Sequence, residues 1–251
     1  MPEQAGLTVR LRQTGPITLD AELSCGEGEL LALVGPSGSG KTTILRAIAG
    51  LYRPQHGRVA CGGVVWLDTE RNLDMPPYRR RVGVVFQSYA LFPHMTALGN
   101  VMTALGHLRA SERRSRASAL LALVHLQGFE ERRPSALSGG QQQRVAVARA
   151  LAREPEVLLL DEPFSAVDRR TRRGLHDELS ELRKAVHMPI VLVTHDLDEA
   201  AALADRICVL DAGTTLQSGP PAEVLAAPVS QRVSEALDLP LRAYQTPRGG
   251  T

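Results

Sequence analysis

The sequence predicts an α/β fold with a mostly parallel sheet, an antiparallel β region near the N-terminus and an inserted helical subdomain. Short runs of consecutive apolar residues recur between helical stretches, as is typical of parallel strands buried on both faces. Alternating and turn-containing segments lie before residue 70, and the pattern is helical from about residue 88 to residue 150. At 251 residues, the chain is long enough to bury a full α/β core.

Two strands and a helix are expected first along the chain. ITLDAEL at 17–23 alternates so that its apolar side chains share one face, and ELLALVG at 29–35 is a continuous apolar run that ends in glycine. KTTILRAIAG then has helical spacing, and Gly50 is placed to end that helix.

The remaining strands are separated by turns or by helical stretches. The glycine pair in GRVACGGVVWLD predicts that this segment forms two strands joined as a hairpin. The expected segments are GRVACGGVVWLD (57–68), VGVVF (82–86), VLLLDE (157–162), PIVLVTH (189–195), RICVLD (206–211) and the strand-like TTLQSG (214–219). After about residue 228 the chain is rich in proline and polar residues, and we expect it to be loosely packed.

Composition argues against several classes of protein. The chain has 43% hydrophobic residues and a net charge of +2, which gives no electrostatic reason to expect binding to nucleic acid. Three cysteines without a CxxC spacing imply neither a disulfide framework nor a zinc site, and they fit a reducing cytoplasm. No signal pattern is present, and the apolar runs are too short to span a bilayer. Contact with a membrane is therefore expected only through a partner chain.

The segment GPSGSGKTT matches GxxxxGK followed by Ser or Thr, and it lies between a predicted buried strand and a helix. Its glycines allow consecutive amide groups to turn around phosphate oxygens at a helix N-terminus. Lys41 can reach the β- and γ-phosphates, and the Thr42 hydroxyl can bind Mg²⁺. A Gly/Ser-rich turn that matches by chance would not explain this context. The residues expected to bind the nucleotide here are Gly35, Pro36, Ser37, Gly38, Ser39, Gly40, Lys41, Thr42 and Thr43.

Two carboxylates follow the apolar strand VLLLDE, whose end should lie beside this loop. Asp161 is placed to orient Mg²⁺ and its waters, since hard cations take oxygen ligands. Glu162, one residue further, could polarise a water that attacks the γ-phosphate. An acidic pair after a strand is alone more often an ordinary polar loop, but beside a phosphate-binding loop the catalytic interpretation is favoured.

The stretch LSGGQ at 137–141 begins a strongly helix-forming segment with two glycines, which disfavour helix. A capping box would explain Ser138 and Gln141, because each can bond to the other's backbone amide. That interpretation leaves Gly139 and Gly140 unexplained.

The alternative for LSGGQ is a second phosphate site. The glycine pair lets the backbone approach an anion at a helix N-terminus, and the Ser138 hydroxyl can bond to a γ-phosphate oxygen. A γ-phosphate that Lys41 already holds cannot easily accommodate a distant helix of the same chain. We therefore expect two subunits to associate head to tail, each offering its LSGGQ to the nucleotide of the other. A GTPase is disfavoured because neither lysine of the chain lies in an NKxD motif.

Together these motifs resemble those of the ATP-binding cassette (ABC) ATPases over nearly the whole chain, and the resemblance implies that the chain binds ATP and Mg²⁺. Gln87 resembles the Q-loop glutamine that senses Mg²⁺ and nucleotide. Asp168 in SAVD resembles the D-loop aspartate, which would lie across the dimer interface. His195 in VTHDLDEA resembles the switch histidine that contacts the γ-phosphate. The implied catalytic residues are Glu162, His195 and Gln87, and the implied metal ligands are Thr42, Gln87 and Asp161.

The chain departs from the family's pattern at the nucleobase. Family members usually stack adenine on an aromatic residue shortly before the phosphate-binding loop, but no Phe, Tyr or Trp precedes Tyr52. The stacking partner is expected to be the guanidinium of Arg10 or Arg12, or an aliphatic side chain such as Ile17.

The stretch 75–101 resembles the importer ATPases for molybdate, sulfate, iron and polyamines, and its pattern looks closest to the molybdate branch. In those proteins the segment after Gln87 receives a helix of the membrane subunit, so permease subunits are expected to dock near Gln87–Pro93. The apolar lining would be Tyr89, Leu91, Phe92 and Pro93, although Phe92 could equally be packed inside the subdomain.

The resemblance also sets expectations for organisation and place in the cell. An ATPase domain is expected over residues 1–235, with the helical subdomain at about 88–150, and residues 236–251 would be a short tail without a C-terminal regulatory domain. The chain would dimerise, work indirectly with a substrate-binding protein, and lie at the cytoplasmic face of the inner membrane. A non-transport ABC ATPase and a nucleoside kinase are the alternatives.

Overall fold

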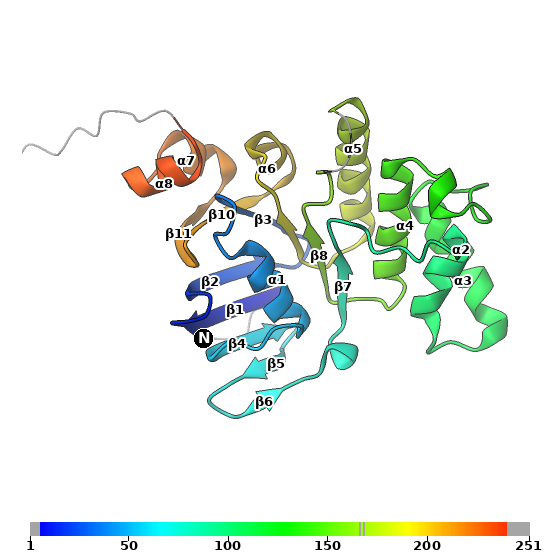
Figure 1. The fold of residues 1–251 in the computed structure, drawn as a ribbon, viewed down its shortest axis with the longest axis horizontal. Helices are drawn as coiled ribbons and strands as arrows, with labels where there is room; N and C mark the ends of the chain where they lie inside the picture. Colours follow the sequence, from blue (N-terminus) through cyan, green and yellow to red (C-terminus); the bar gives the residue numbers. More distant parts are fainter. Residues whose placement is uncertain (1–5, 166, 168, 240–251) are drawn as a thin grey trace, which may run out of the picture.

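The computed structural model describes residues 6–165, 167 and 169–239. Their strands form one sheet in the order β6-β5-β4-β1-β2-β11-β10-β3-β9-β8-β7 (Figure 1). One half of this sheet is parallel and the other half is largely antiparallel, as the sequence predicts.

The parallel half is made by the continuous apolar runs, and every residue of β3 and β9 is buried. Each strand pairs in parallel with the next. In spatial order they are β10 (Arg206–Asp211), β3 (Leu30–Val34), β9 (Ile190–Val193), β8 (Val157–Asp161) and β7 (Val82–Val85). Because their carboxyl ends lie at one edge, the loops after β3, β7, β8 and β9 come close together.

The antiparallel half comes from the first third of the chain, with one strand from near its end. It consists of β1 (Gly6–Gln13), β2 (Leu19–Gly26), β4 (His56–Cys61), β5 (Val64–Asp68), β6 (Leu73–Asp74) and β11 (Thr214–Gly219). The predicted hairpin is confirmed as β4 and β5. Strand β1 lies outside the strands expected from the sequence, although Leu7, Val9 and Leu11 alternate and are buried.

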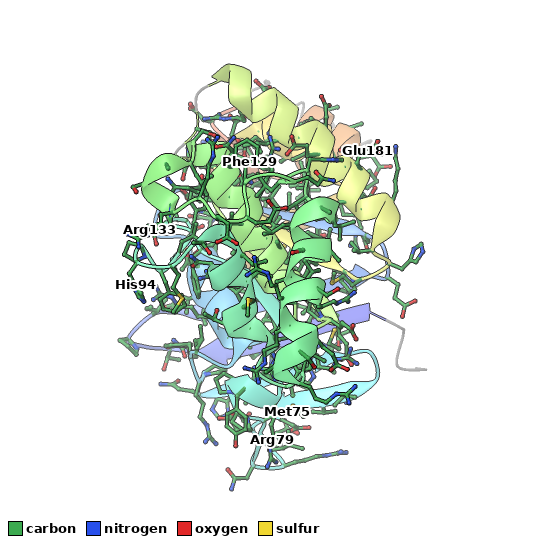
Figure 2. The ribbon with its side chains drawn as sticks, turned by 90° about the vertical axis from the view of Figure 1, so that its right-hand side faces the viewer. Met75, Arg79, His94, Phe129, Arg133 and Glu181 are labelled. Carbon is green, nitrogen blue, oxygen red and sulfur yellow. The ribbon has the colours of Figure 1, made fainter. Side chains whose placement is uncertain are left out.

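The helices other than α7 (Pro221–Ala226) and α8 (Gln231–Ala236) form two groups. The helix α1 (Lys41–Ala49) packs beside the sheet and ends at Gly50, as predicted, with a left-handed φ of 77°. The others of the core are α5 (Arg169–Ala185) and α6 (Leu197–Leu203). The inserted subdomain lies beyond β7 and contains α2 (Ala97–Met102), α3 (Ala110–Leu123), α4 (Gly139–Leu151) and the 3-10 helices η2 (Thr103–Leu105) and η3 (Pro134–Ala136); η1 (Pro77–Arg79) precedes β7. Figure 2 shows this subdomain in front of the sheet.

The expectation of a loosely packed end is wrong for the residues up to 239. Helices α7 and α8 pack against β10 and β11, and Val224, Val233 and Leu237 are buried there. The spacing of Val233 and Leu237 places them on one helical face, so that apolar burial outweighs the polar composition. Among the described residues, no helix is both long and apolar enough to cross a bilayer.

Candidate active site

The loop between β3 and α1 is shaped around glycines. A Cβ on Gly35 would lie 1.9 Å from the Leu210 carbonyl oxygen, so that only glycine fits beside β10. Helix α1 has Gly40 as its N-cap, and no side chain caps its first turn. The amide groups of that turn therefore remain available to an anion, which the N-terminal end of the helix dipole also favours. Of the other predicted loop residues, Pro36, Ser37 and Gly38 are exposed, Ser39 is buried, and Thr42 and Thr43 are half-buried.

Lys41 is buried in this loop. Its Nζ donates to the carbonyl oxygens of Gly35 at 2.9 Å and Pro36 at 2.8 Å, and to the Ser39 hydroxyl at 3.2 Å. Burial lowers the pKa of Lys41, whereas the carboxylates of Glu162 and Asp161 act in the opposite direction. A buried cation held by backbone carbonyls beside the uncapped first turn of α1 fits a phosphate chain.

Thr42 and Asp161 bring two oxygen donors together beside the loop. The Thr42 hydroxyl donates to Asp161 Oδ1 at 3.1 Å, although the two residues are 119 positions apart in the chain. Burial raises the pKa of Asp161, and the bond from Thr42 acts against that rise. Hydroxyl and carboxylate oxygens are ligands that Mg²⁺ prefers, so the pair fits the predicted metal site.

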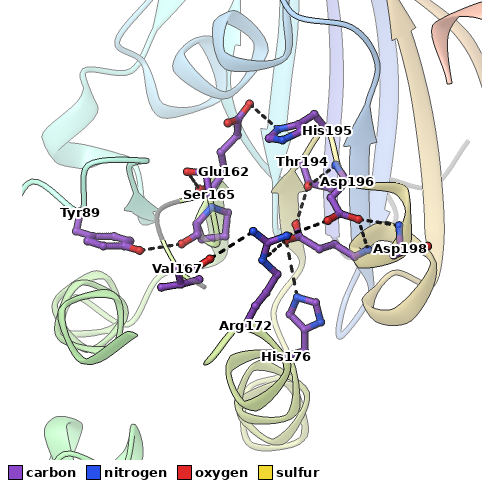
Figure 3. A network of polar contacts seen from close by, with 12 residues as sticks. Tyr89, Glu162, Ser165, Val167, Arg172, His176, Thr194, His195, Asp196 and Asp198 are labelled. Carbon is purple, nitrogen blue, oxygen red and sulfur yellow. Dashed lines mark hydrogen bonds and ion pairs between the residues drawn. The ribbon is translucent and has the colours of Figure 1, made fainter. Parts of the chain in front are cut away.

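The three residues predicted to be catalytic meet at Glu162. Gln87 Nε2 donates to Glu162 Oε2 at 3.2 Å. His195 Nδ1 lies 3.5 Å from Glu162 Oε1 (Figure 3). They come from the loops after β7, β8 and β9, which the parallel sheet places side by side. The predictions therefore converge on one place, at the carboxyl edge of the sheet.

The backbone holds Glu162 in an uncommon conformation. Its φ is +46°, in the left-handed region that a residue with a side chain rarely adopts. The Glu162 amide donates to the Val193 carbonyl at 3.0 Å, and the Glu162 carbonyl accepts from the amide and hydroxyl of Ser165 at 3.2 and 2.9 Å. These bonds offset the cost of the left-handed conformation, which aims the carboxylate at the loop edge.

The LSGGQ turn begins α4 as a closed capping box. The Gln141 amide donates to Ser138 Oγ at 3.3 Å, and the Ser138 amide donates to Gln141 Oε1 at 3.0 Å. Ser138 is exposed and Gly140 is buried. The structural interpretation of this turn is therefore geometrically correct, and it does not exclude a phosphate from the exposed side. Figure 1 shows β7 and β8 between α4 and α1, so the turn does not reach the loop of its own chain. Asp168 lies outside the described residues.

A family model described as ABC transporter matches residues 19–165. The chain belongs to the ABC transporter family. The resemblance inferred from the motifs is thus confirmed, and so is the α/β fold class.

Three relatives illustrate the similarity. The "Fe(3+) ions import ATP-binding protein FbpC 1" of Rhizobium meliloti is 49% identical over 229 residues, which cover 89% of this chain and 63% of the relative. The "Sulfate/thiosulfate import ATP-binding protein CysA" of Xanthomonas campestris pv. campestris is 51% identical, covering 84% and 62%. The "Spermidine/putrescine import ATP-binding protein PotA" of Bacillus cereus is 45% identical, covering 85% and 63%. This chain thus spans about three-fifths of the length of the curated relatives it matches.

A solved structure agrees with the fold. It is described as a dimeric structure of a post-hydrolysis state of the ATP-binding cassette MJ0796 bound to ADP and Pi. Its TM-score is 0.70 at 33% identity, and the match covers 86% of this chain and 98% of that one.

The segment after Gln87 differs in part from the ABC-based expectation. Tyr89 is 4% exposed, so it does not line a docking surface, and its hydroxyl donates to the Pro163 carbonyl at 3.2 Å instead. Phe92 is 43% exposed, so the alternative of a packed Phe92 is wrong. Pro93 is also exposed, and Leu91 is half-buried against the core.

Sequence reasoning missed Arg149, which fixes this segment. Its two terminal nitrogens each donate at 2.7 Å, to the carbonyls of Tyr89 and Ala90, both of which have a left-handed φ. Burial lowers the pKa of Arg149. The available signal was an arginine placed among Ala and Val on α4, where a charge needs a specific partner.

The base-stacking candidates fall into two groups. Arg10 and Arg12 are bound to Glu22 and Asp20 across β1 and β2, at the outer face of the antiparallel half. Ile17 is exposed in the turn just before β2. The beginning of β2 lies next to the phosphate-binding loop, because the Leu19 side chain would be 3.3 Å from a Cβ on Gly40. Of the three candidates, Ile17 therefore lies on the segment that leads to the loop.

Proposed function

We propose that this chain is the ATP-hydrolysing subunit of an ABC importer and that it acts as a dimer around two ATP molecules. The observation that carries the proposal is the meeting of Gln87, Glu162 and His195 next to the loop that contains Lys41. A surface turn with no function would not need a left-handed glutamate between two polar partners from separate loops.

Each residue has a distinct role in this proposal. The loop amides and Lys41 bind the phosphates, and Thr42, Asp161 and Gln87 hold Mg²⁺, which supplies positive charge next to the phosphate oxygens. Glu162 accepts the proton of the attacking water. His195 would contact the γ-phosphate. The His195 side chain is 63% exposed against 26% for Glu162, which suits a group that meets a ligand from solvent.

The partner subunit would complete the site. Ser138, Gly139, Gly140 and Gln141 would face the nucleotide of the other subunit, since α4 is remote from its own loop. Asp168 would lie at the same interface. A homodimer or a paired ATPase subunit satisfies this arrangement equally.

The membrane partners would be permease subunits that dock on the exposed pair Phe92 and Pro93. The chain would then be peripheral at the cytoplasmic face of the inner membrane, and a substrate-binding protein would deliver the solute. The names of the relatives favour iron, sulfate or a polyamine as the solute, and molybdate gains no support from them. We propose an inorganic ion, with ferric iron or sulfate first.

The test compares the purified chain with its Glu162→Gln variant. Hydrolysis should fall by a factor on the order of 10² or more while ATP binding persists, because only the proton acceptor is lost. Steady-state hydrolysis near the wild-type rate in the variant would rule out this role of Glu162. Copurification with a polytopic membrane protein separates an importer from a non-transport ABC ATPase.

A further inference from the structure

A partly buried polar cluster lies behind His195, and none of the roles assigned above uses it. It joins Arg172 and His176 of α5 to Thr194, Asp196 and Glu199, which lie on both sides of His195 in the chain (Figure 3). A charged cluster in this position is costly unless its groups are bound to one another.

Glu199 anchors the residue that precedes His195. Its carboxylate side chain is only 5% exposed, and its Oε2 accepts from the Thr194 hydroxyl at 2.6 Å. The Thr194 hydroxyl also accepts from the Asp196 amide at 3.0 Å. Burial raises the pKa of Glu199, and the bond from Thr194 opposes that rise. The amide of the residue after His195 is thus bonded to the hydroxyl of the residue before it, and Glu199 holds that hydroxyl.

On the other side of His195, the residue that follows it, Asp196, is itself held in place. It is the N-cap of α6, and its Oδ1 accepts from the amides of Asp198 at 2.9 Å and Glu199 at 3.2 Å. Its other oxygen, Oδ2, accepts from Arg172 Nη1 at 3.0 Å. The direction in which His195 leaves the backbone therefore depends on two carboxylates, Asp196 and Glu199.

Arg172 contacts both carboxylates, that of Asp196 and that of Glu199. Its Nε lies 3.5 Å from Glu199 Oε1, and its Nη2 donates to the Val167 carbonyl at 3.4 Å, in the turn that follows Glu162. Arg172 is the side chain by which α5 meets both carboxylates next to His195.

Two nitrogens in the cluster have unused bonding capacity. Arg172 Nε and His176 Nε2 are buried without a hydrogen bond among the described residues, and both face Glu199 Oε1, at 3.5 and 4.0 Å. The His176 ring also lies edge-on to Phe164, with ring centroids 4.8 Å apart. A shift of less than about 1 Å of α5 toward α6 would bring the Arg172 donor, and the His176 ring when Nε2 carries a proton, into bonding range of Glu199. A change in the position of α5 would therefore directly change the contacts of the carboxylates of Asp196 and Glu199.

We propose that Arg172 is a positioning residue for His195. By holding Asp196 and Glu199, Arg172 fixes the orientation of the His195 side chain and couples that orientation to the position of α5. This inference rests on the proposed function, in which His195 contacts the γ-phosphate.

The chain offers a matched control in Arg183. It lies on the same helix, its side chain is 23% exposed against 27% for Arg172, and it also bonds to a backbone carbonyl at the end of α6, that of Leu203, at 3.0 Å. It pairs with Asp205, ten residues beyond His195. Arg183→Met should therefore cost packing similar to that of Arg172→Met, without touching the residues that flank His195.

The first experiment is a double-mutant cycle on ATP hydrolysis, below the melting temperature of each variant. Arg172→Met should lower kcat about tenfold with little change in KM, since a small misplacement of a reacting group affects mainly the transition state. In a His195→Ala background the same change should have almost no further effect. Arg172→Lys should recover part of the loss, and Arg183→Met should leave kcat unchanged. An equal loss in both backgrounds, or no loss at all, overturns the proposal.

The second experiment does not depend on hydrolysis. The imidazole proton resonance of His195 is assigned by its absence from the spectrum of His195→Ala. Arg172→Met should shift or broaden that resonance, whereas Arg183→Met should not. An unchanged His195 resonance in Arg172→Met overturns the positioning role even if the chain hydrolyses ATP. A shifted resonance in a chain that hydrolyses no ATP would keep the positioning role and overturn the proposed function.

Discussion

Helices α1 and α4 both begin at glycine-containing turns, yet the two turns differ in what satisfies their amides. Helix α1 begins after Gly40, which has no side chain to act as a cap. Helix α4 begins after Ser138, which exchanges bonds with Gln141. The first turn of α1 therefore keeps its donors for a ligand, whereas in the first turn of α4 the Gln141 amide is already satisfied by Ser138.

Under the proposed function, the turn of α4 is the one that acts on the nucleotide of a second subunit. The turn of α1 has its own cation in Lys41, and Asp161 and Thr42 stand beside it. At α4, the Ser138 hydroxyl oxygen accepts from the Gln141 amide, and the same hydroxyl can donate its proton to a phosphate. The cap contributes about 1 kcal/mol and need not be lost, while a bond to a charged phosphate adds about 1.5–3 kcal/mol once a nucleotide is presented.

The largest effect is expected at α1. Lys41→Ala removes the only lysine near the phosphates, so ATP affinity should fall at least about tenfold and hydrolysis by a factor on the order of 10². Equilibrium titration with a fluorescent ATP analogue measures the first quantity, and phosphate release measures the second. Unchanged affinity would mean that the loop of α1 is not the phosphate site.

The next effect tests whether α4 acts in the other subunit. Ser138→Arg places a bulky cation where the partner's γ-phosphate would lie, and it leaves the loop of its own chain intact. Each of Ser138→Arg and Lys41→Ala should be inactive alone, but their mixed dimer rebuilds one complete site. Mixing should thus recover at most about half of the wild-type hydrolysis, and less where the two sites are coupled.

As a control, the formation of mixed dimers is monitored by size-exclusion chromatography with ATP in the absence of Mg²⁺. Mixed dimers that form and remain inactive at every ratio would contradict the placement of LSGGQ in the partner's site. Full activity of Ser138→Arg alone would leave the capping box as the whole explanation of the turn.

A smaller effect separates capping from ligand binding at α4. Ser138→Ala and Gln141→Ala each open the capping box, and Ser138→Ala should cost about 1 kcal/mol of stability, with Gln141→Ala costing no more. Only Ser138→Ala should also lower kcat, by about tenfold or more, since it removes the hydroxyl aimed at a phosphate. Thermal melts and initial rates on both variants make the comparison. Equal losses of kcat would assign the turn to structure alone.

The smallest effect concerns the base. Most of the affinity for the nucleotide is expected to come from the phosphates, which would bind at the N-terminal turn of α1. Ile17→Ala should therefore weaken ATP binding by less than about fivefold. Arg10→Ala serves as the control and should change nothing, because Arg10 is bound to Glu22. A larger loss in Arg10→Ala than in Ile17→Ala would reverse the assignment of the stacking residue.

The sequence predicted the structure best in segments whose conformation depends on their own residues rather than on distant contacts. Continuous apolar runs predicted β3, β8, β9 and β10, and the carboxyl edge of a parallel sheet explains why Glu162 and His195 could be expected together. Gly50 was recognisable as a helix end because its conformation is a local property.

Features that depend on distant partners could not be predicted. Tyr89 is apolar enough to line a docking surface, and its burial depends on distant partners, the Pro163 carbonyl on another loop and Arg149 on α4. Arg172 and Glu199 look like ordinary helix-surface charges until α5 and α6 are packed against each other. Helix α8 was missed because its composition is polar, although the spacing of its few apolar residues was available in the sequence.

The bonds from Arg149 to Tyr89 and Ala90 also limit how this chain can evolve. Two consecutive left-handed residues with side chains cost about 1–2 kcal/mol each, and the arginine offsets that cost through their carbonyls. A descendant that loses Arg149 would be under selection to place glycine or asparagine at those two positions, where the left-handed conformation is cheap. The three positions are therefore expected to substitute as a set, and an alignment of close relatives should show arginine paired with side-chain-bearing residues and its absence paired with glycine or asparagine.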